Sequence, residues 1–201
     1  MTDLLTAAEA RFALGRGASD TSKSELLSMA ITAVTQLIEG QIGPVVYGTV
    51  TAEAYDGGGN VLYLKTRPVA QIIQVVEYDV TTAATLTAES NTSKPDSAYL
   101  FSAENGRLRR RSGNADARFP VGSGNVLVTY VAGRCVAGSI PAQYKLAAAE
   151  TLKSGWRAFE AANTTLGEFE VPQQTFPTFA VPKVIKDRLS GDWQVGSGGF
   201  D

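Results

Sequence analysis

Apolar side chains recur every three to four residues between Ser22 and Gly40, which is the spacing of an amphipathic helix. Successive residues of a helix turn by about 100°, so the apolar positions share an arc of about 140° and the polar ones lie opposite. Ser22 and Glu25 match a capping box, and Gly40 is suited to end the helix. The apolar positions are Leu26, Leu27, Ala30, Ile31, Val34, Leu37 and Ile38. Such a helix needs a second apolar surface to cover it.

The same spacing returns much further along the chain, between Pro141 and Asn163. Proline is favoured in the first turn of a helix. We expect this helix to pack against the Ser22–Gly40 helix, so that the two ends of the chain close on each other. Small residues recur every seven positions and suit a close approach of the two helices: Ala148, Gly155 and Ala162. A glycine that is simply tolerated at position 155 is the alternative.

Two shorter helices are expected near the chain ends. Thr6 and Glu9 form a capping-box pattern ahead of Leu14, and Gly15 supplies a stop. The segment Pro182–Leu189 gathers its apolar side chains on one side, as a short helix would.

Between Val45 and Val131 the chain is rich in Val, Thr, Tyr and Gly, and its patterning predicts about six or seven strands. The run Asp56–Asn60 is expected to turn the first strand back onto the second, and Asn105-Gly106 to form another hairpin. Strands joined by hairpins favour an antiparallel sheet or small sandwich. The expected strands are Val46–Tyr55, Val61–Lys65, Val69–Tyr78, Val80–Ala88, Ala98–Phe101, Arg107–Arg111 and Asn125–Val131.

The sequence therefore predicts an α+β fold. N- and C-terminal helices form a small helical bundle, with an inserted antiparallel β-sheet or small sandwich and an extended C-terminal tail. We expect residues 1–163 to form the helical core, with the β-rich insertion at about 45–131, and residues 164–201 to form a docking tail. Scattered apolar anchors without a core of their own favour docking on another surface.

The composition narrows the chemistry. None of the 201 residues is a histidine, and Cys135 is the single cysteine, which removes the commonest general base and the usual zinc ligands. Without a histidine, a plain thiol is favoured over a nucleophile even beside Arg134. The net charge of −2 does not predict binding to nucleic acid or membrane, and no apolar run is long enough to span one. We expect no enzymatic activity, no cofactor, no metal and no membrane partner.

Two acidic or glycine-rich features allow a chemical interpretation. The Asp56–Asn60 run lacks the following helix of a phosphate loop and the further carboxylates of a calcium loop, so a plain turn is favoured. The pairs Glu168–Glu170 and Asp56–Glu77 are candidates for carboxylate catalysis, but nothing in the sequence brings either pair together.

The densest basic group lies between Arg107 and Arg111. On a strand, Arg107, Arg109 and Arg111 would share one face, with Arg110 on the other beside Leu108. Such a strip suits phosphates. The alternative is an exposed edge strand whose charge prevents pairing with other strands, and the lack of interleaved aromatic residues favours it.

Four stretches follow one another in an informative order. They are Asp3–Leu14 (DLLTAAEARFAL), Glu25–Gly40 (ELLSMAITAVTQLIEG), Tyr63–Val76 (YLKTRPVAQIIQVV) and Asn125–Trp156, in which NVLVTYVAG precedes IPAQYKLAAAETLKSGW. Together they resemble the head–tail connector proteins of long-tailed bacteriophages, also called adaptor or head-completion proteins. In that family an Arg-Pro-Val pattern follows a Tyr-Asp-Gly turn, as it follows Tyr55-Asp56-Gly57 here. The resemblance covers most of residues 3–160.

The resemblance implies a non-catalytic structural protein of the virion neck, assembled in the host cytoplasm. Such proteins form a ring of about a dozen copies beneath the portal, and DNA passes through it without sequence specificity. The implied partners are the portal protein, neighbouring copies, the next neck or tail-terminator protein, and DNA. The portal-docking candidates are Phe176, Phe179, Val184, Ile185, Leu189 and Trp193. The subunit-interface candidates are Glu25, Thr32, Gln36 and Glu39, and the DNA-channel candidates are Arg107, Arg109 and Arg111.

A monomeric β-rich tail or baseplate accessory module that contacts carbohydrate is the alternative. It requires an exposed aromatic cluster on the strands, for which Tyr47, Tyr63 and Tyr78 are the candidates.

Overall fold

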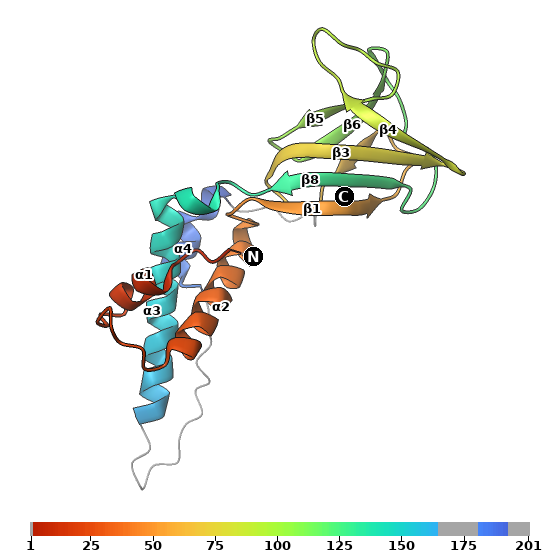
Figure 1. Cartoon of the computed structure of the whole chain (residues 1–201). Coiled ribbons are helices and arrows are strands. Elements are labelled where there is room, and N and C mark those ends of the chain that lie inside the picture. The colour runs from red at the N-terminus through yellow and green to blue at the C-terminus, as the bar shows by residue number, and fades with distance from the viewer. Residues whose placement is uncertain (1, 165–180, 193–201) are drawn as a thin grey trace. The chain divides into compact units, whose positions relative to one another are not determined.

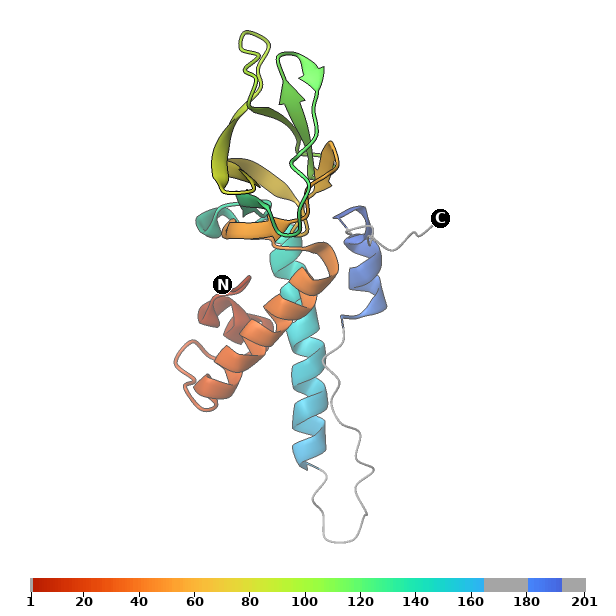
Figure 2. The same ribbon diagram turned by 90° about the vertical axis from the view of Figure 1, so that its right-hand side faces the viewer.

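The structure is a computed structural model that describes the backbone of residues 2–164 and 181–192, and the side chains of residues 2–160 and 181–191. The chain forms two compact units, and each is described by itself. The helical unit comprises residues 1–45 and 137–201, and the β unit comprises residues 46–136. The predicted α+β fold, with N- and C-terminal helices around an inserted sheet, is confirmed (Figures 1 and 2).

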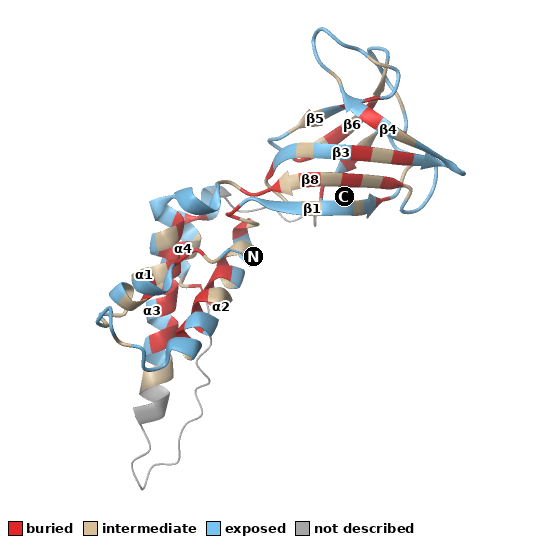
Figure 3. Ribbon diagram, viewed as in Figure 1, coloured by how far each residue is buried: buried red, intermediate tan, exposed pale blue. Residues whose placement is uncertain are grey.

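The helical unit is built on two long helices that pack side by side, α2 (Ser24–Ile42) and α3 (Ala142–Thr164). The shorter α1 (Ala7–Ala13) contacts both, and α4 (Lys183–Arg188) contacts α3. Two 3-10 turns, η1 (Ala137–Ser139) and η2 (Ser190–Asp192), lie in the same unit. The buried stripe along α2 and α3, red in Figure 3, consists largely of the predicted apolar residues, among them Leu27, Ile31, Val34, Ile38, Tyr144, Ala148, Leu152 and Trp156.

The start of α2 differs from the prediction. Ser22 does not cap the helix, because its backbone N–H and its hydroxyl both donate to Asp20 Oδ1, at 2.9 and 2.5 Å. The N-cap is Lys23, which adopts a left-handed conformation (φ 70°) without a side-chain capping bond. The predicted capping box of Ser22 with Glu25 is therefore wrong.

The end of α2 differs too. The helix passes through Gly40 and continues to Ile42, which is fully buried in the core. It stops at Gly43 (φ 79°), whose N–H donates to the carbonyl of Glu39 at 2.8 Å. The side chain of Ile42 adds apolar burial that favours the longer helix.

The β unit holds eight strands in the order β1-β8-β3-β4-β5-β6-β2, with β7 paired to β6. All pairs are antiparallel except β4–β5, so the sheet is mixed and the antiparallel prediction is wrong for that pair. Burial alternates along β8, and the core gathers large side chains such as Tyr130, Phe119 and Leu108. The strands are β1 (Gly48–Tyr55), β2 (Val61–Tyr63), β3 (Val69–Asp79), β4 (Thr82–Ala88), β5 (Ala98–Ser102), β6 (Arg107–Ser112), β7 (Ala115–Asp116) and β8 (Val126–Ala132).

The Asp56–Asn60 run does not form the predicted hairpin, because β1 pairs with β8 and β2 pairs with β6. Its backbone is bound to a distant loop instead. The Gly57 N–H lies 2.9 Å from both the Gly122 carbonyl and the Asn125 side-chain oxygen, and the Gly58 N–H donates to the Phe119 carbonyl. The run therefore crosses from one part of the sheet to another.

Candidate assembly surfaces

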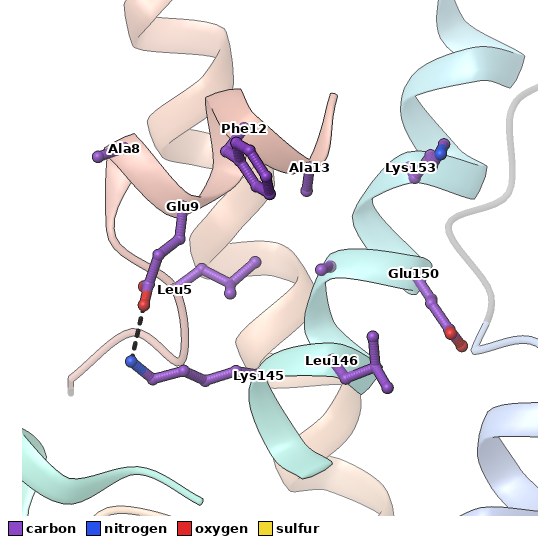
Figure 4. A pocket seen from close by; sticks show the side chains of 10 residues that line it. Leu5, Ala8, Glu9, Phe12, Ala13, Lys145, Leu146, Glu150 and Lys153 are labelled. Atoms are coloured by element: carbon purple, nitrogen blue, oxygen red, sulfur yellow. Dashed lines mark hydrogen bonds and ion pairs between the residues drawn. The ribbon is translucent and has the colours of Figure 1, made fainter. Parts of the chain in front are cut away.

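The first candidate surface is a groove between α1 and α3, with a volume of about 710 Å³ (Figure 4). Thr6 caps α1 as predicted, since its hydroxyl accepts from Glu9 N–H and its own N–H donates to Glu9 Oε2. The other oxygen of Glu9 accepts from Lys145 Nζ at 2.7 Å and so ties α1 to α3. We call this surface the α1–α3 groove; it is lined by Leu5, Ala8, Glu9, Phe12, Ala13, Lys145, Leu146, Ala149, Glu150 and Lys153.

The floor of the α1–α3 groove is apolar and its rim is charged. The side chain of Phe12 is 87% exposed and that of Leu146 is 52% exposed, which is unfavourable for large apolar groups left in water. Glu150 pairs with Arg188 of α4 at 3.1 Å. Lys153 is exposed and has no ion pair among the residues that the structure describes. The groove therefore offers apolar contact together with one available positive charge.

The second candidate surface is the outer face of α2, defined here by Glu25, Met29, Thr32, Gln36 and Gly40. The spacing of four, three, four and four residues places them along one side of the helix. The side chain of Met29 is 69% exposed, and nothing lies within 4 Å of the position that a Cβ would take at Gly40. The helix itself contains no lysine or arginine.

The four predicted subunit-interface residues differ in their surroundings. Glu25 and Gln36 are exposed. The hydroxyl of Thr32 donates to Asp3 at 3.3 Å, and the carboxylate of Glu39 accepts from Val45 N–H at 2.9 Å. Thr32 and Glu39 thus also serve the fold of their own chain, whereas Glu25 and Gln36 are free to meet another molecule.

The predicted portal-docking residues on α4 and just after it differ in how far they are exposed. Val184 is 60% exposed, while Ile185 and Leu189 are buried in the helical unit. Phe176, Phe179 and Trp193 lie outside the described residues. On α4, therefore, Val184 is the apolar candidate that a partner can reach.

The arginines of β6 alternate as predicted, with Leu108 and Arg110 buried and the other three half-buried. Arg111 binds Glu89 and Asp116, and Arg109 lies 3.6 Å from Asp116. The carboxylates of Glu89 and Asp116 offset the positive charge of both. Arg107 has no ion pair within the described part of the chain. Of the three DNA-channel candidates, Arg107 keeps its charge most available.

The buried Arg110 has a different role. Its guanidinium binds both oxygens of Glu77, at 2.9 and 2.8 Å, and also donates to the carbonyls of Asp96 and Ala98. This bidentate pair joins β3 to the β5–β6 hairpin, so Glu77 is structural and unavailable as a catalytic carboxylate.

The remaining candidates for chemistry are Asp56, Cys135, Glu168 and Glu170. The carboxylate of Asp56 accepts from Ser123 and Gly124, which holds its pKa below the usual value, with the Ser123 hydroxyl the larger cause. Burial raises the pKa of the Cys135 thiol, so a thiolate is disfavoured. Glu168 and Glu170 lie outside the described residues.

Tyr55 and Tyr130 form a polar cluster in the β unit. Both hydroxyls donate to Glu53 Oε2, and they accept from the N–H groups of Lys65 and Thr66. Burial, followed by the bond to Glu53, raises the pKa of both phenols. The cluster anchors the Lys65-Thr66 loop to the core.

Two general findings apply to the described residues. They contain no group of three or more carboxylate, cysteine or histidine side chains that would hold a metal ion. None of their helices has both the length and the apolar character required to cross a membrane.

The sequence prediction placed its subunit-interface candidates on α2 and included no residue of the α1–α3 groove. A signal was present, because Leu146 lies off the buried arc of α3 and Phe12 is a large apolar residue in a very short helix. Apolar side chains off the core face indicate a second contact surface where several of them gather, as Phe12 and Leu146 do in the groove.

Comparisons with known proteins identify the fold. No protein-family model and no curated protein matches the sequence. A chain from the neck of an empty GTA particle with C6 symmetry matches with a TM-score of 0.57 and 19% identity, over 98% of this chain and 93% of that one. A chain from the virion of a native gene transfer agent (GTA) particle matches with a TM-score of 0.53 and 18% identity, over the same shares. This chain is similar to both over nearly its whole length and shares their fold.

Proposed function

We propose that this chain is a structural component of the neck of a phage or phage-derived particle. The observation that carries the proposal is the fold shared with the neck chain of the GTA particle, which extends over 98% of this chain. The resemblance to head–tail connector proteins, carried by stretches of both units, supports the same conclusion independently. A neck component acts by binding its neighbours, so we propose no enzymatic activity.

In finer detail, the protein is an adaptor that forms a ring beneath the portal. The ring joins the DNA-filled capsid to the next neck or tail-terminator protein and lets DNA pass. Phe12, Met29 and Leu146 support this proposal, because a chain that acts alone gains nothing by exposing such side chains on its helical unit. Two such surfaces on one chain suit a protein that is enclosed by copies of itself.

We assign portal docking to the C-terminal segment, through Val184 on the exposed side of α4. Changing Val184 to Asp should abolish binding to purified portal and leave the helical unit folded. Asp187, which is exposed on the same helix, supplies the matched control, and its change to Asn should leave portal binding unchanged. Unchanged binding by the Val184→Asp variant would contradict this assignment.

We assign contact with DNA in the channel to Arg107 on the β6 strand. The variant Arg107→Glu should lower DNA retention in filled particles. The matched control is Arg118→Glu, because Arg118 is an exposed arginine of the same unit with no ion pair in the described part of the chain. Equal retention in both variants would favour the exposed-edge interpretation of the strand.

The function itself is tested by removing the protein. Particles assembled without the chain should accumulate as filled heads without tails, and purified protein should restore joining. Normal tailed particles in its absence would refute the proposal. Tailed particles that fail only to attach to cells would instead support the accessory module. The aromatic candidates of that module come from three places in the β unit, with Tyr47 just before β1, Tyr63 on β2 and Tyr78 on β3.

A further inference from the structure

The helical unit exposes two surfaces that differ in shape and chemistry. The α1–α3 groove is concave, with an apolar floor that includes Leu146 and Ala149. The outer face of α2 is one side of a helix, with Met29 as its large apolar side chain. A concave apolar surface and a convex helical one are complementary in shape.

The two surfaces also point in different directions. The buried side of α2, which includes Leu27 and Val34, packs against α1 and α3, so its outer face points away from them. The groove is lined by residues 5–13 and 145–153 and by none from α2. In Figure 4 the groove faces the viewer, with part of the α2 ribbon passing behind it. One copy of the chain therefore cannot fill its own groove with its own α2.

The charges of the two surfaces are opposite. Lys153 on the groove rim is exposed and has no ion pair within the described part of the chain. Glu25 begins the outer face of α2, is exposed, and likewise has no ion pair there. Within Ser24–Ile42, α2 carries no basic residue, and the Lys23 N-cap lies 3.9 Å from the carboxylate of Glu160 on α3.

Gly40 gives an independent indication. It lies within α2, where glycine weakens a helix relative to alanine, yet its surroundings within the chain leave open space for a Cβ. The fold of this chain therefore does not require a glycine there. A closely approaching surface of another molecule would account for it.

We propose that the α1–α3 groove of one copy receives the outer face of α2 from the next copy. Met29 packs on the groove floor, Gly40 permits close approach of the helix to the groove, and Glu25 pairs with Lys153. This inference rests on the proposed ring and names the contact that builds it. Because the two surfaces differ, the contact is head-to-tail, and repeating it with a suitable rotation closes a ring.

Cysteine cross-linking tests the contact directly. In a Cys135→Ser background, one variant carries Gln36→Cys on the outer face of α2 and another carries Ala149→Cys on the groove floor. Under a short thiol cross-linker, a mixture of the two should give dimers of unlike variants, and neither alone should. The variant with both changes should give a ladder of oligomers on a reducing gel. Dimers of Ala149→Cys alone would mean that two grooves meet face to face, which would overturn the proposal.

Charge reversal tests the pairing without a cross-linker. Lys153→Glu and Glu25→Lys should each raise the protein concentration required for assembly at least tenfold. The double variant should assemble at a concentration close to that of the unchanged protein. Arg157→Glu on α3, outside the groove, is the matched control and should assemble like the unchanged protein. Native mass spectrometry gives the oligomer mass, and circular dichroism checks that each variant is folded.

The outcomes separate this inference from the proposed function. If the unchanged protein forms rings, alone or on portal-bearing heads, while the cross-links and charge reversals have no specific effect, the contact is wrong and the ring stands. If the unchanged protein never forms a closed ring, even on portal-bearing heads, both the proposed ring and the proposed contact are wrong. Both the ring and the contact are supported if the protein forms rings, the two unlike cysteine variants cross-link, and the charge-reversed double variant recovers assembly.

Discussion

Lys145 of α3 donates to Glu9 of α1 at 2.7 Å, across 136 positions of sequence. The same carboxylate accepts from Thr6 N–H and closes the capping box that starts α1. One side chain therefore fixes both the beginning of the helix and its attachment to α3. It also forms part of the α1–α3 groove (Figure 4), so the shape of the groove depends on it.

Acidification should loosen this attachment. The bonds from Lys145 and then from Thr6 hold the pKa of Glu9 below its usual value of 4.5. The stabilisation is therefore present above pH 4.5 and is lost as the pH falls through the folded-state pKa. Both side chains are more than a third exposed, so we expect about 0.5 kcal/mol or less.

Urea unfolding followed at 222 nm reports this effect, because the described helices all lie in the helical unit. The stability of the unchanged protein should fall between pH 6 and pH 3.5 by more than that of Glu9→Gln, which cannot titrate at this position. Identical pH profiles would show that Glu9 does not contribute.

The two predicted capping boxes differ in the structure, and substitution should show the difference. Thr6→Ala should cost about 1 kcal/mol of unfolding free energy, since the hydroxyl satisfies the Glu9 N–H. Thr6→Ser should retain most of the stability. Ser22→Ala should cost less than Thr6→Ala, because Ser22 bonds to Asp20 and does not cap α2. Equal losses at both positions would contradict the assigned caps.

The pair Glu77–Arg110 should behave as a buried ion pair. Glu77→Gln or Arg110→Met alone leaves an unpaired buried charge and should destabilise the β unit by about 3–5 kcal/mol. The double variant Glu77→Leu with Arg110→Met removes both charges and should recover most of the loss. Thermal unfolding measures the series, and a double variant as unstable as either single one would count against this explanation.

Two glycines should respond in opposite directions to alanine. A Cβ at Gly57 would lie 1.8 Å from the Pro120 carbonyl oxygen, so Gly57→Ala should disrupt the crossing loop and cost about 2 kcal/mol or more. A Cβ at Gly40 meets nothing within 4 Å, so Gly40→Ala should stabilise α2 by about 0.5–1 kcal/mol in the monomer. Loss of monomer stability in Gly40→Ala would contradict the open surroundings.

Local patterns predicted the helices and most strands well. The capping box of Thr6 and Glu9 involves neighbours three residues apart, and the apolar stripe of α2 repeats within the helix itself, so both are visible in a short window of sequence. The alternation of β6 was visible in the same way, including the placement of Arg110 on the face of Leu108, whereas the burial of Arg110 against Glu77 was not predicted.

Strand pairing was predicted less well because long-range contacts decide it. The Asp56–Asn60 run has the composition of a hairpin turn, but Asn125 and Gly122 bind its backbone from nearly seventy residues away. The wrong cap at Ser22 has a different cause, because the hydroxyl of Ser22 donates to Asp20, a competing acceptor only two residues away. The α1–α3 groove was missed because it forms only when two helices that are distant in sequence lie side by side. The pattern within a single segment does not specify that pairing.

Electron cryomicroscopy of the head–tail junction, in particles that contain this chain, tests the central claim most directly. The proposal predicts a closed ring of this chain between the portal and the next neck protein, with the outer face of α2 seated in the groove of its neighbour. A junction that lacks the chain, or holds it as isolated copies that do not touch, would contradict it.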